Sequence, residues 1–389
     1  MPNFDFFSVP TIIFGRGQFS RIGELAAALG KRALLVFNGS EPIAARLAEM
    51  LVAAGIHAQQ FRQRGEPKVA DVDTALNVAR QSQCDMVIGL GGGSAIDCAK
   101  AVAGLLANGG EALDYMEVVG KGQKISRAAA PWIAIPTTAG TGAEVTRNAV
   151  IGAPERKFKA SIRGEQLLAR MALVDPELGV STPANVTASS GMDALCQCIE
   201  AYTSSGAQPM TDALALRGIR AAGRSLWRAF LDGTDIDARE QMALAALFSG
   251  IALTNAGLGA VHGFAAPLGA NFPVPHGVVC AALLPHVIAA NIAAARAISA
   301  DHPVLLRYAD VGRLLAGEPG MTNAAAIEAA GRVCADLSRD LAIPPLRNFG
   351  IDEAAVTPMT ALAKKASSMR FNPLPLSETA LEQVLREAI

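Results

Sequence analysis

The sequence predicts an α/β domain built on a doubly wound parallel sheet, followed by an all-α domain. In the first half, short apolar runs alternate with longer amphipathic ones, which is typical of strands and helices in an α/β layer arrangement. From about Ser181 onward, Ala- and Leu-rich segments with helical periodicity replace this alternation. Because 389 residues with 51% hydrophobic residues can bury large cores, we expect two domains, 1–180 and 181–389.

The same patterns predict individual elements. Buried parallel strands are expected at three apolar runs, Ala33–Phe37, Met86–Leu90 and Trp132–Ile135. Between them, Glu41–Ala54 and Val72–Ser82 carry apolar residues three and four apart and therefore predict helices. The run Met171–Val174, which DPEL follows, predicts the last strand of the sheet.

The composition favours a small-molecule partner. Lys plus Arg (34) nearly equals Asp plus Glu (35), so we expect neither nucleic acid nor a membrane as a partner. The segment Gly277–Ala295 is almost free of charge, but Pro285 and His286 interrupt it, which favours a core helix over a membrane span. The start, MPNFDFFSVP, lacks the basic flank and apolar run of a signal peptide and predicts a cytoplasmic protein. The six cysteines show no zinc-module spacing and are interpreted as reduced, buried thiols.

A glycine loop follows the predicted strand Met86–Leu90. Gly92, Gly93 and Ser94 stand at the start of a helical run that also contains Asp97. Backbone N–H groups at such a helix start can approach a pyrophosphate, and the helix dipole favours its charge. Glycine also serves plain turns, but the position between strand and helix favours phosphate binding.

A second polar loop, PTTAGTGAEVT, follows the strand that ends at Ile135. Thr137, Thr138 and Thr141 would donate hydrogen bonds to a phosphate, a ribose or a carboxamide without adding bulk, although a plain Thr-rich turn is the other interpretation. Both loops lie at the carboxyl ends of predicted strands, where open α/β sheets bind ligands.

Two histidines of the helical half, His262 and His276, flank a glycine-rich segment. Imidazole is the commonest metal ligand, and two histidines near an acidic residue form a minimal site for zinc or ferrous iron. Each histidine taken alone is more often a core residue with a hydrogen-bond partner, so the spacing does not decide between the two interpretations.

Asp193 is the candidate acidic partner of these histidines. It is expected in the first turns of a helix that Ser189 or Ser190 would cap. Gln197 stands four residues later on the same helical face and offers a weaker, neutral oxygen donor.

Together, these segments resemble the iron-containing alcohol dehydrogenase family, within the wider group of glycerol dehydrogenases and dehydroquinate synthases. The matching segments are FGRG (14–17), GLGGGSAIDCAK (89–100), PTTAGTGAEVT (136–146), VDPEL (174–178), GMDAL (191–195), IEAY (199–202) and the histidine segment 262–277. The resemblance implies a Rossmann-like N-terminal domain and a helical C-terminal domain, the dehydroquinate synthase-like fold. It also implies direct hydride transfer between a nicotinamide and an alcohol, aldehyde or ketone whose oxygen a divalent metal polarises. We further expect a homodimer.

The cofactor implied by the resemblance is NAD or NADP. The glycine loop with Ser94 would hold the pyrophosphate, the three threonines would line the adenine, ribose and nicotinamide side, and Asp97 is a further cofactor-binding candidate. Lys159 falls where the family places a lysine near the nicotinamide ribose. Many relatives carry an aspartate at the position of Asn38, where it repels the 2′-phosphate of NADP. Asn38 therefore predicts that NADP is tolerated.

The metal implied by the resemblance is Fe²⁺, Zn²⁺ or Mn²⁺, with Asp193, His262 and His276 as ligands and position 197 completing the set. The family's aspartate and histidine lie four residues apart, whereas this chain has Gln197. The alcohol dehydrogenases also usually show a histidine four residues after His262, linked to proton relay, and this chain has Ala266.

Three alternatives remain open at this point. The enzyme would be metal-independent, as maleylacetate-reductase-like relatives usually are, if the loss of one ligand abolished metal binding. It would be a dehydroquinate synthase-like lyase if the same cofactor and metal layout served another reaction. It would be a nucleotide-binding protein without catalysis if the remaining ligands did not come together.

Overall fold

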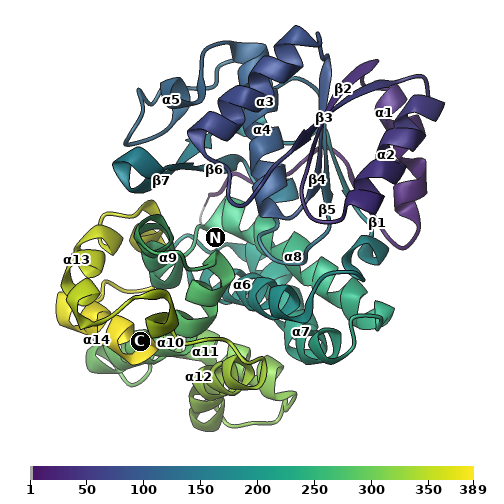
Figure 1. Ribbon diagram of the computed structural model, residues 1–389. Helices are drawn as coiled ribbons and strands as arrows, with labels where there is room; N and C mark the ends of the chain where they lie inside the picture. The colour runs from purple at the N-terminus through teal and green to yellow at the C-terminus, as the bar shows by residue number, and fades with distance from the viewer. Residues whose placement is uncertain (1–2) are drawn as a thin grey trace. The chain divides into compact units, whose positions relative to one another are not determined.

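Six parallel strands form the sheet of the first unit, which covers residues 7–182 of the computed structural model (Figure 1). In spatial order they are β1 (Ile12–Phe14), β8 (Met171–Val174), β5 (Trp132–Pro136), β4 (Met86–Gly91), β2 (Arg32–Phe37) and β3 (His57–Arg62). The structure describes residues 3–389, and the second unit comprises 183–389 together with 3–6.

Helices cover both faces of the sheet, as a doubly wound arrangement requires (Figure 1). On one face α1 (Ile22–Ala27) and α2 (Glu41–Ala53) bury Ile22, Leu47 and Leu51 in a core with the strand residues. On the other lie α3 (Val69–Gln81) and α4 (Gly93–Asn108). The remaining elements of the unit are α5 (Ala112–Tyr115) and a hairpin of β6 (Asn148–Ala153) and β7 (Phe158–Arg163).

The strand order contains a switch point between β2 and β4. The chain passes from β2 outward to β3, returns to place β4 on the other side of β2, and then continues in the opposite direction to β5. In open α/β sheets, ligands bind in the crevice outside the carboxyl ends of the strands at such a point. Asn38 directly follows β2, and Gly92 directly follows β4.

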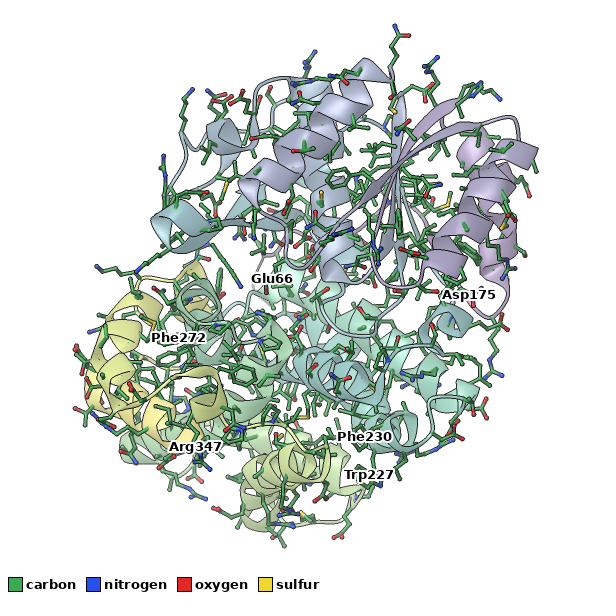
Figure 2. All side chains as sticks on the ribbon, in the orientation of Figure 1. Glu66, Asp175, Trp227, Phe230, Phe272 and Arg347 are labelled. Carbon is green, nitrogen blue, oxygen red and sulfur yellow. The ribbon has the colours of Figure 1, made fainter. Side chains whose placement is uncertain are left out.

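Asp175, the first residue after β8, joins two further segments of the sequence motifs (Figure 2). Its Oδ2 accepts a hydrogen bond from the Phe19 N–H at 2.9 Å, and its Oδ1 accepts one from the Glu177 N–H at 3.0 Å. The aspartate of VDPEL therefore caps its own 3-10 turn and fixes the turn that follows the FGRG segment.

The second unit is helical throughout residues 183–389. Its α-helices are α6 (Ala184–Thr203), α7 (Pro209–Leu231), α8 (Ile236–Ala256), α9 (Ala260–Asn271), α10 (His276–Ile298), α11 (Pro303–Ala316), α12 (Asn323–Asp340), α13 (Glu353–Ala363) and α14 (Glu378–Ala388). α6 is buried almost all around and packs against α7, α8 and α10. Polar side chains on this helix are therefore held inside the unit.

α10 is long and apolar enough to cross a membrane by length and composition, as is the bent pair of α8 and α9. However, 61% of the most apolar window of α10 is buried, and the helix packs against α6, α9, α12 and α14. Inside the helix, Asn291 is buried and hydrogen-bonded to Asn372, so its amide has a local partner. This packing supports the interpretation of the segment as a core helix.

The predicted fold class is confirmed, and the predicted strands and helices agree with the structure to within three residues at their ends. One detail was wrong. α6 begins at Ala184, after Pro183, so Ser189 and Ser190 lie inside the helix and do not cap it. Ser190 Oγ instead donates to the carbonyl of Val186 at 2.7 Å, a back-bond available to serine inside a helix.

Candidate functional site

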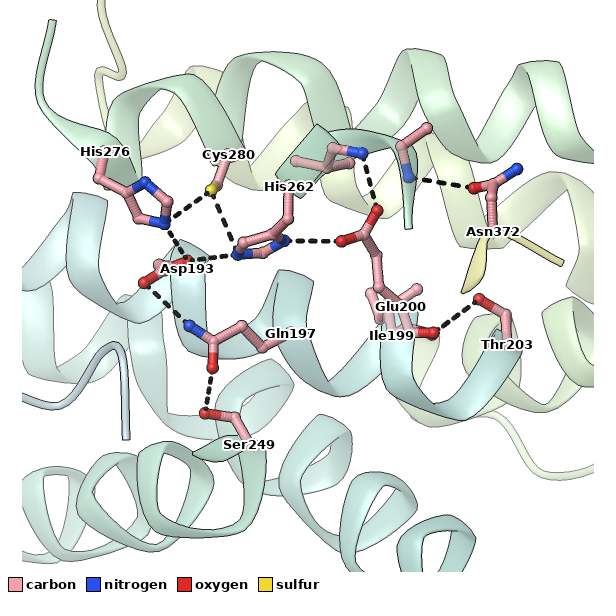
Figure 3. A network of polar contacts seen from close by, with 12 residues as sticks. Asp193, Gln197, Ile199, Glu200, Thr203, Ser249, His262, His276, Cys280 and Asn372 are labelled. Carbon is pink, nitrogen blue, oxygen red and sulfur yellow. Dashed lines mark hydrogen bonds and ion pairs between the residues drawn. The ribbon is translucent and has the colours of Figure 1, made fainter. Parts of the chain in front are cut away.

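Three helices of the second unit bring the predicted metal ligands together (Figure 3). Asp193 comes from the middle of α6, His262 from the first turn of α9 and His276 from the first residue of α10. Asp193 Oδ1 lies 3.3 Å from His262 Nε2 and 3.7 Å from His276 Nε2. Asp193 and His262 are buried, whereas 37% of the His276 side chain is exposed, so His276 lies on the open side of the cluster.

Glu200, two turns after Asp193 on α6, fixes the orientation of His262. Its Oε2 lies 2.6 Å from His262 Nδ1, and its Oε1 accepts the Val261 N–H at 2.7 Å. A carboxylate is an acceptor, so Nδ1 carries a proton and donates it to Glu200, which leaves Nε2, facing Asp193, as the atom that can bind a metal once its own proton has left. A carboxylate behind a metal-binding histidine is the usual supporting arrangement in metal sites.

Gln197 lies beside the cluster without pointing its oxygen into it. Its Nε2 donates to Asp193 Oδ2 at 3.2 Å, and its Oε1 accepts from Ser249 Oγ at 3.1 Å (Figure 3). The reversed amide would set two acceptor oxygens against each other at Asp193, so the hydrogen bonds favour this orientation. In this arrangement Gln197 positions the Asp193 carboxylate and leaves Oδ1 facing the histidines.

A pair of asparagines fixes the start of α9. Asn372 Oδ1 accepts the Ala260 N–H at 3.1 Å, and Asn372 Nδ2 donates to Asn291 Oδ1 at 2.7 Å. Gly259 precedes the helix at a close approach, because a Cβ there would lie 2.8 Å from both Asn372 Oδ1 and Glu200 Oε1. These contacts fix the N-terminal end of α9, and His262 lies in the first turn of that helix.

The cluster contains a residue that the sequence motifs did not single out. Cys280 stands one turn after His276 on α10, and its Sγ lies 3.7 Å from both His262 Nε2 and His276 Nε2. The candidate ligand atoms of Asp193, His262, His276 and Cys280 all lie within 4.8 Å of one another. All six cysteines are free and buried, as expected. Cys280 is, in addition, a candidate metal ligand.

The cluster combines acidic and basic groups, and each kind shifts the pKa values of the other toward the charged forms. Burial opposes the charged form of every member, but the Cys280 thiolate and Asp193 outweigh burial at His276 and raise its pKa to about 9. Cys280, Asp193 and Glu200 likewise raise the pKa of His262 well above its usual value. The pKa of Asp193 is lowered despite burial, because His276 and His262 stabilise its charge. The Cys196 hydrogen bond and the two histidines lower the pKa of Cys280 well below that of a free thiol, again against burial.

In the first unit, the glycine loop lies at the switch point of the sheet. Asn38 Oδ1 accepts the Gly92 N–H at 2.9 Å and thus ties the end of β2 to the end of β4. Gly91 has a φ of 142°, and a Cβ there would lie 1.9 Å from Asn38 Oδ1, so no larger residue fits. Gly92 precedes α4, with Gly93 and Ser94 in its first turn, so free N–H groups stand at the helix start.

The threonine loop closes over these glycines. A Cβ on Gly93 would lie 2.8 Å from Thr141 Oγ1, and one on Gly92 would lie 3.2 Å from Thr138 Oγ1. The Thr137 N–H donates to the Gly91 carbonyl at 2.9 Å. The structure therefore brings the two predicted loops together at the carboxyl ends of β4 and β5.

Two other cofactor candidates have partners within the protein. Asp97 Oδ2 accepts the Val150 N–H at 3.1 Å, and its Oδ1 lies 3.3 Å from the ammonium of Lys100, which is fully buried. Lys159, on β7, pairs with Glu66. Cofactor binding by Asp97 and Lys159 remains a prediction, since each has a structural role in this arrangement.

His286, a third histidine of the helical half, lies partly exposed and pairs with an acidic residue. Its Nδ1 lies 3.0 Å from Glu387 Oε2 on α14. Ala266 occupies the position on α9 where the family usually has a histidine.

Sequence reasoning missed Glu200 and Cys280 as site residues. The available signals were positional: Glu200 lies seven residues after Asp193, and Cys280 lies four after His276, each on the same helical face as its partner.

Comparisons with known proteins cover nearly the whole chain. Residues 10–176 match the family model of the iron-containing alcohol dehydrogenase, and residues 187–389 match that of the C-terminal region of the Fe-containing alcohol dehydrogenase family. The NAD-dependent methanol dehydrogenase of Bacillus methanolicus is 34% identical over 99% of this chain and 100% of its own. The 1,3-propanediol dehydrogenase of Klebsiella pneumoniae is 35% identical over 99% and 98%. A crystal structure of a 1,3-propanediol oxidoreductase superposes with a TM-score of 0.92 at 35% identity and covers 100% of both chains.

These matches confirm the predicted resemblance and the predicted reaction class. The protein is an oxidoreductase that acts on CH–OH groups, and its family uses NAD(P) and a divalent metal. The chain belongs to the iron-containing alcohol dehydrogenase family.

Proposed function

We propose that this protein interconverts small alcohols and their aldehydes or ketones, with NAD(P) bound by the unit 7–182 and a divalent metal bound by the unit 183–389. The observation that carries the proposal is the convergence of Asp193, His262 and His276 from three helices, with Glu200 fixing the tautomer of His262. Primary alcohols and short diols are the first substrates to try, since the relatives include a methanol dehydrogenase and a 1,3-propanediol dehydrogenase.

The donor set fits a divalent metal. Two imidazole Nε2 atoms and one carboxylate oxygen converge, and three such protein ligands suffice for a catalytic zinc site. A bound Zn²⁺, Fe²⁺ or Mn²⁺ would supply Lewis-acid polarisation of the substrate oxygen. The protein's own part is to hold the ligands: Glu200 keeps the proton of neutral His262 on Nδ1, so that Nε2 is the atom left for the metal, and Gln197 keeps the Asp193 carboxylate turned toward the histidines.

The dinucleotide would be held by the loops at the switch point of the sheet. The N–H groups at the start of α4 and the hydroxyl of Ser94 would bind the pyrophosphate, and Thr138 and Thr141 would close over it. Thr137, Asp97 and Lys159 are the further cofactor-binding candidates. The nicotinamide supplies hydride transfer, and the protein supplies orientation and exclusion of water. Because Ala266 carries no titratable group, a water or a hydroxyl group would have to move the substrate proton.

Asn38 supports acceptance of NADP as well as NAD. Its amide is neutral, so it does not repel a 2′-phosphate as a carboxylate would. In the structure its Oδ1 accepts the Gly92 N–H, a bond that an aspartate would also make, so Asn38→Asp keeps the loop contact and changes the charge. Measuring kcat/KM for NADH and NADPH with one substrate should show NADPH turnover that falls, relative to NADH, in Asn38→Asp. An unchanged ratio between the two cofactors contradicts this assignment.

The most direct test of the proposed function combines metal analysis of the purified protein with a cofactor-oxidation screen over aldehydes and ketones. We expect stoichiometric divalent metal, reduction of at least one carbonyl, loss of activity with a chelator and recovery with added metal. Full activity in rigorously metal-free protein would support the metal-independent alternative. Carbonyl reduction would also separate the proposal from a lyase and from a nucleotide-binding protein without catalysis.

We further propose a cytoplasmic homodimer. β1 forms one edge of the parallel sheet and has only β8 as a partner strand among the described residues, so its outer edge is open to pairing with a second copy. The six free cysteines fit a reducing compartment. Sedimentation analysis tests the dimer. The Thr11 carbonyl and the Gly15 N–H pair with β8, so the N–H of Ile12 points to the open edge, and Ile12→Pro should shift the equilibrium toward monomer if β1 lies in the interface.

A further inference from the structure

The sequence predicts Gln197 as the fourth metal ligand, and the structure offers a thiol in its place. His276 and Cys280 are one turn apart on α10 and lie on the same face of the helix. Cys280 is fully buried, and its Sγ is equidistant, at 3.7 Å, from His262 Nε2 and His276 Nε2 (Figure 3). These are the two nitrogen atoms that face Asp193 Oδ1.

The distances among these atoms are those expected around one tetrahedral ion. With bonds of about 2.0 Å to nitrogen and oxygen and about 2.3 Å to sulfur, tetrahedral angles place N and O about 3.3 Å apart and N and S about 3.5 Å apart. The observed N–O separations to Asp193 are 3.3 and 3.7 Å. The observed N–S separations are both 3.7 Å. These four separations are close to those around one tetrahedral ion, and all four ligand atoms lie within 4.8 Å of one another.

Gln197 is poorly arranged for the same task. Its Oε1 accepts the Ser249 hydroxyl, and the group it turns toward Asp193 is an NH₂, which repels a cation. Ligation by Gln197 would break both hydrogen bonds and leave the buried Ser249 hydroxyl with one acceptor fewer. Cys280 needs no such rearrangement.

We propose that Cys280 binds the metal as a thiolate, so that the site is formed by Asp193, His262, His276 and Cys280. This inference rests on the metal site of the proposed function and names its fourth ligand. On binding, the Cys280 sulfur and the two Nε2 atoms would form bonds to the metal, and the protons that these three groups hold in the metal-free protein would leave to solvent. A thiolate is a soft donor that favours Zn²⁺ over Mn²⁺. The site would therefore favour zinc, and a substrate would reach it from the side of His276, whose side chain is 37% exposed.

X-ray absorption at the zinc edge tests the proposal on the full-length, zinc-loaded protein. We expect one sulfur neighbour at about 2.3 Å from the metal in the wild type and none in Cys280→Ala. The matched control is Cys334→Ala, which removes another fully buried thiol, on α12, and should retain the sulfur neighbour. A wild-type spectrum with nitrogen and oxygen neighbours only overturns the proposal, as does sulfur that persists in Cys280→Ala.

Metal selectivity gives an independent readout. Competition titrations with a chromophoric chelator should show that Cys280→Ala lowers the affinity for Zn²⁺ at least about tenfold and the affinity for Mn²⁺ much less, because sulfur contributes mainly to zinc binding. Adding Gln197→His in the Cys280→Ala background should restore zinc affinity with a shell of nitrogen and oxygen only. Equal losses for both ions would contradict the proposal, and circular dichroism of each variant identifies losses caused by unfolding.

The outcomes also separate this inference from the proposed function. Wild-type protein that holds zinc through nitrogen and oxygen alone, and still reduces a carbonyl with NAD(P)H, overturns only the role of Cys280. Wild-type protein that binds no divalent metal under any loading condition overturns the role of Cys280 and the metal site of the proposed function together.

Discussion

Replacing Glu200 with Gln should weaken metal binding without removing any ligand. The Glu200 carboxylate accepts two hydrogen bonds, from Val261 N at 2.7 Å and from His262 Nδ1 at 2.6 Å. A glutamine side chain has one acceptor oxygen, so one of these two donors must face an NH₂ group. If that donor is His262, the favoured tautomer moves the proton to Nε2, the atom that would bind the metal.

The expected loss can be estimated in two ways. A hydrogen bond to a charged group contributes about 1.5–3 kcal/mol. Mutation of a carboxylate behind a metal-binding histidine typically lowers metal affinity about 10–100-fold, which is about 1.4–2.8 kcal/mol. Both routes give the same range. We therefore expect the dissociation constant for Zn²⁺ to rise about 10–100-fold in Glu200→Gln.

A competition titration with a chromophoric chelator measures this change, and nitrogen-15 NMR of labelled histidine reports the tautomer of His262. The matched control is Glu144→Gln, which makes the same substitution at another buried glutamate, in the unit without the metal ligands. Its zinc affinity should equal that of the wild type. A Glu200→Gln variant with zinc affinity within about twofold of wild type would refute the reasoning, because it would show that Glu200 does not determine the protonation of His262.

Further predictions concern the first unit. Burial raises the pKa of Glu144 to about 7, so between about pH 4.5 and 7 the folded state holds a proton that the unfolded state has released, and stability falls as pH rises. Urea unfolding should show that the free energy of unfolding falls by about 3 kcal/mol between about pH 5 and about pH 7.5 in the wild type and not in Glu144→Gln. The same pH dependence in both proteins would contradict this assignment. Gly93→Ala places a Cβ 2.8 Å from Thr141 Oγ1 and should weaken dinucleotide binding about tenfold by calorimetry, more than Gly92→Ala, whose Cβ meets Thr138 at 3.2 Å. Equal effects of the two alanines would argue against close packing of the loops as the cause.

The parts of the fold that sequence reasoning predicted are those with strong periodicity. Met86–Leu90 and Trp132–Ile135 are continuous apolar runs because their strands are buried on both faces, and both lie inside observed strands. β3, HAQQFR, was not predicted, because it is an exposed edge strand whose polar residues resemble a loop. The hairpin of β6 and β7 was also missed, since its turn contains no glycine and passes through Lys157 at a positive φ.

The candidate site divides in a similar way. Asp193, His262 and His276 were predicted from residue type and resemblance, and the structure brings them together, although ligation itself remains a prediction. Glu200 and Cys280 were missed because their importance arises from contacts between helices distant in sequence, 62 residues apart for Glu200 and His262. A cysteine inside an apolar helical pattern looks like any core residue until the neighbouring helix is in place.

The close approach of α10 to α6 explains how such a site can exchange one ligand for another. A Cβ on Gly277 would lie 2.3 Å from the carbonyl oxygen of Ser189, so the two helix backbones are almost in contact next to His276. A change there would move several ligands at once, whereas a change at position 197 or 280 alters a single donor atom on a fixed frame. With Cys280 as the fourth ligand, the donor that the family pattern places on α6 at position 197 would instead come from α10. Relatives of this fold with an incomplete histidine set are consequently worth searching for a substitute donor one helical turn from a remaining ligand.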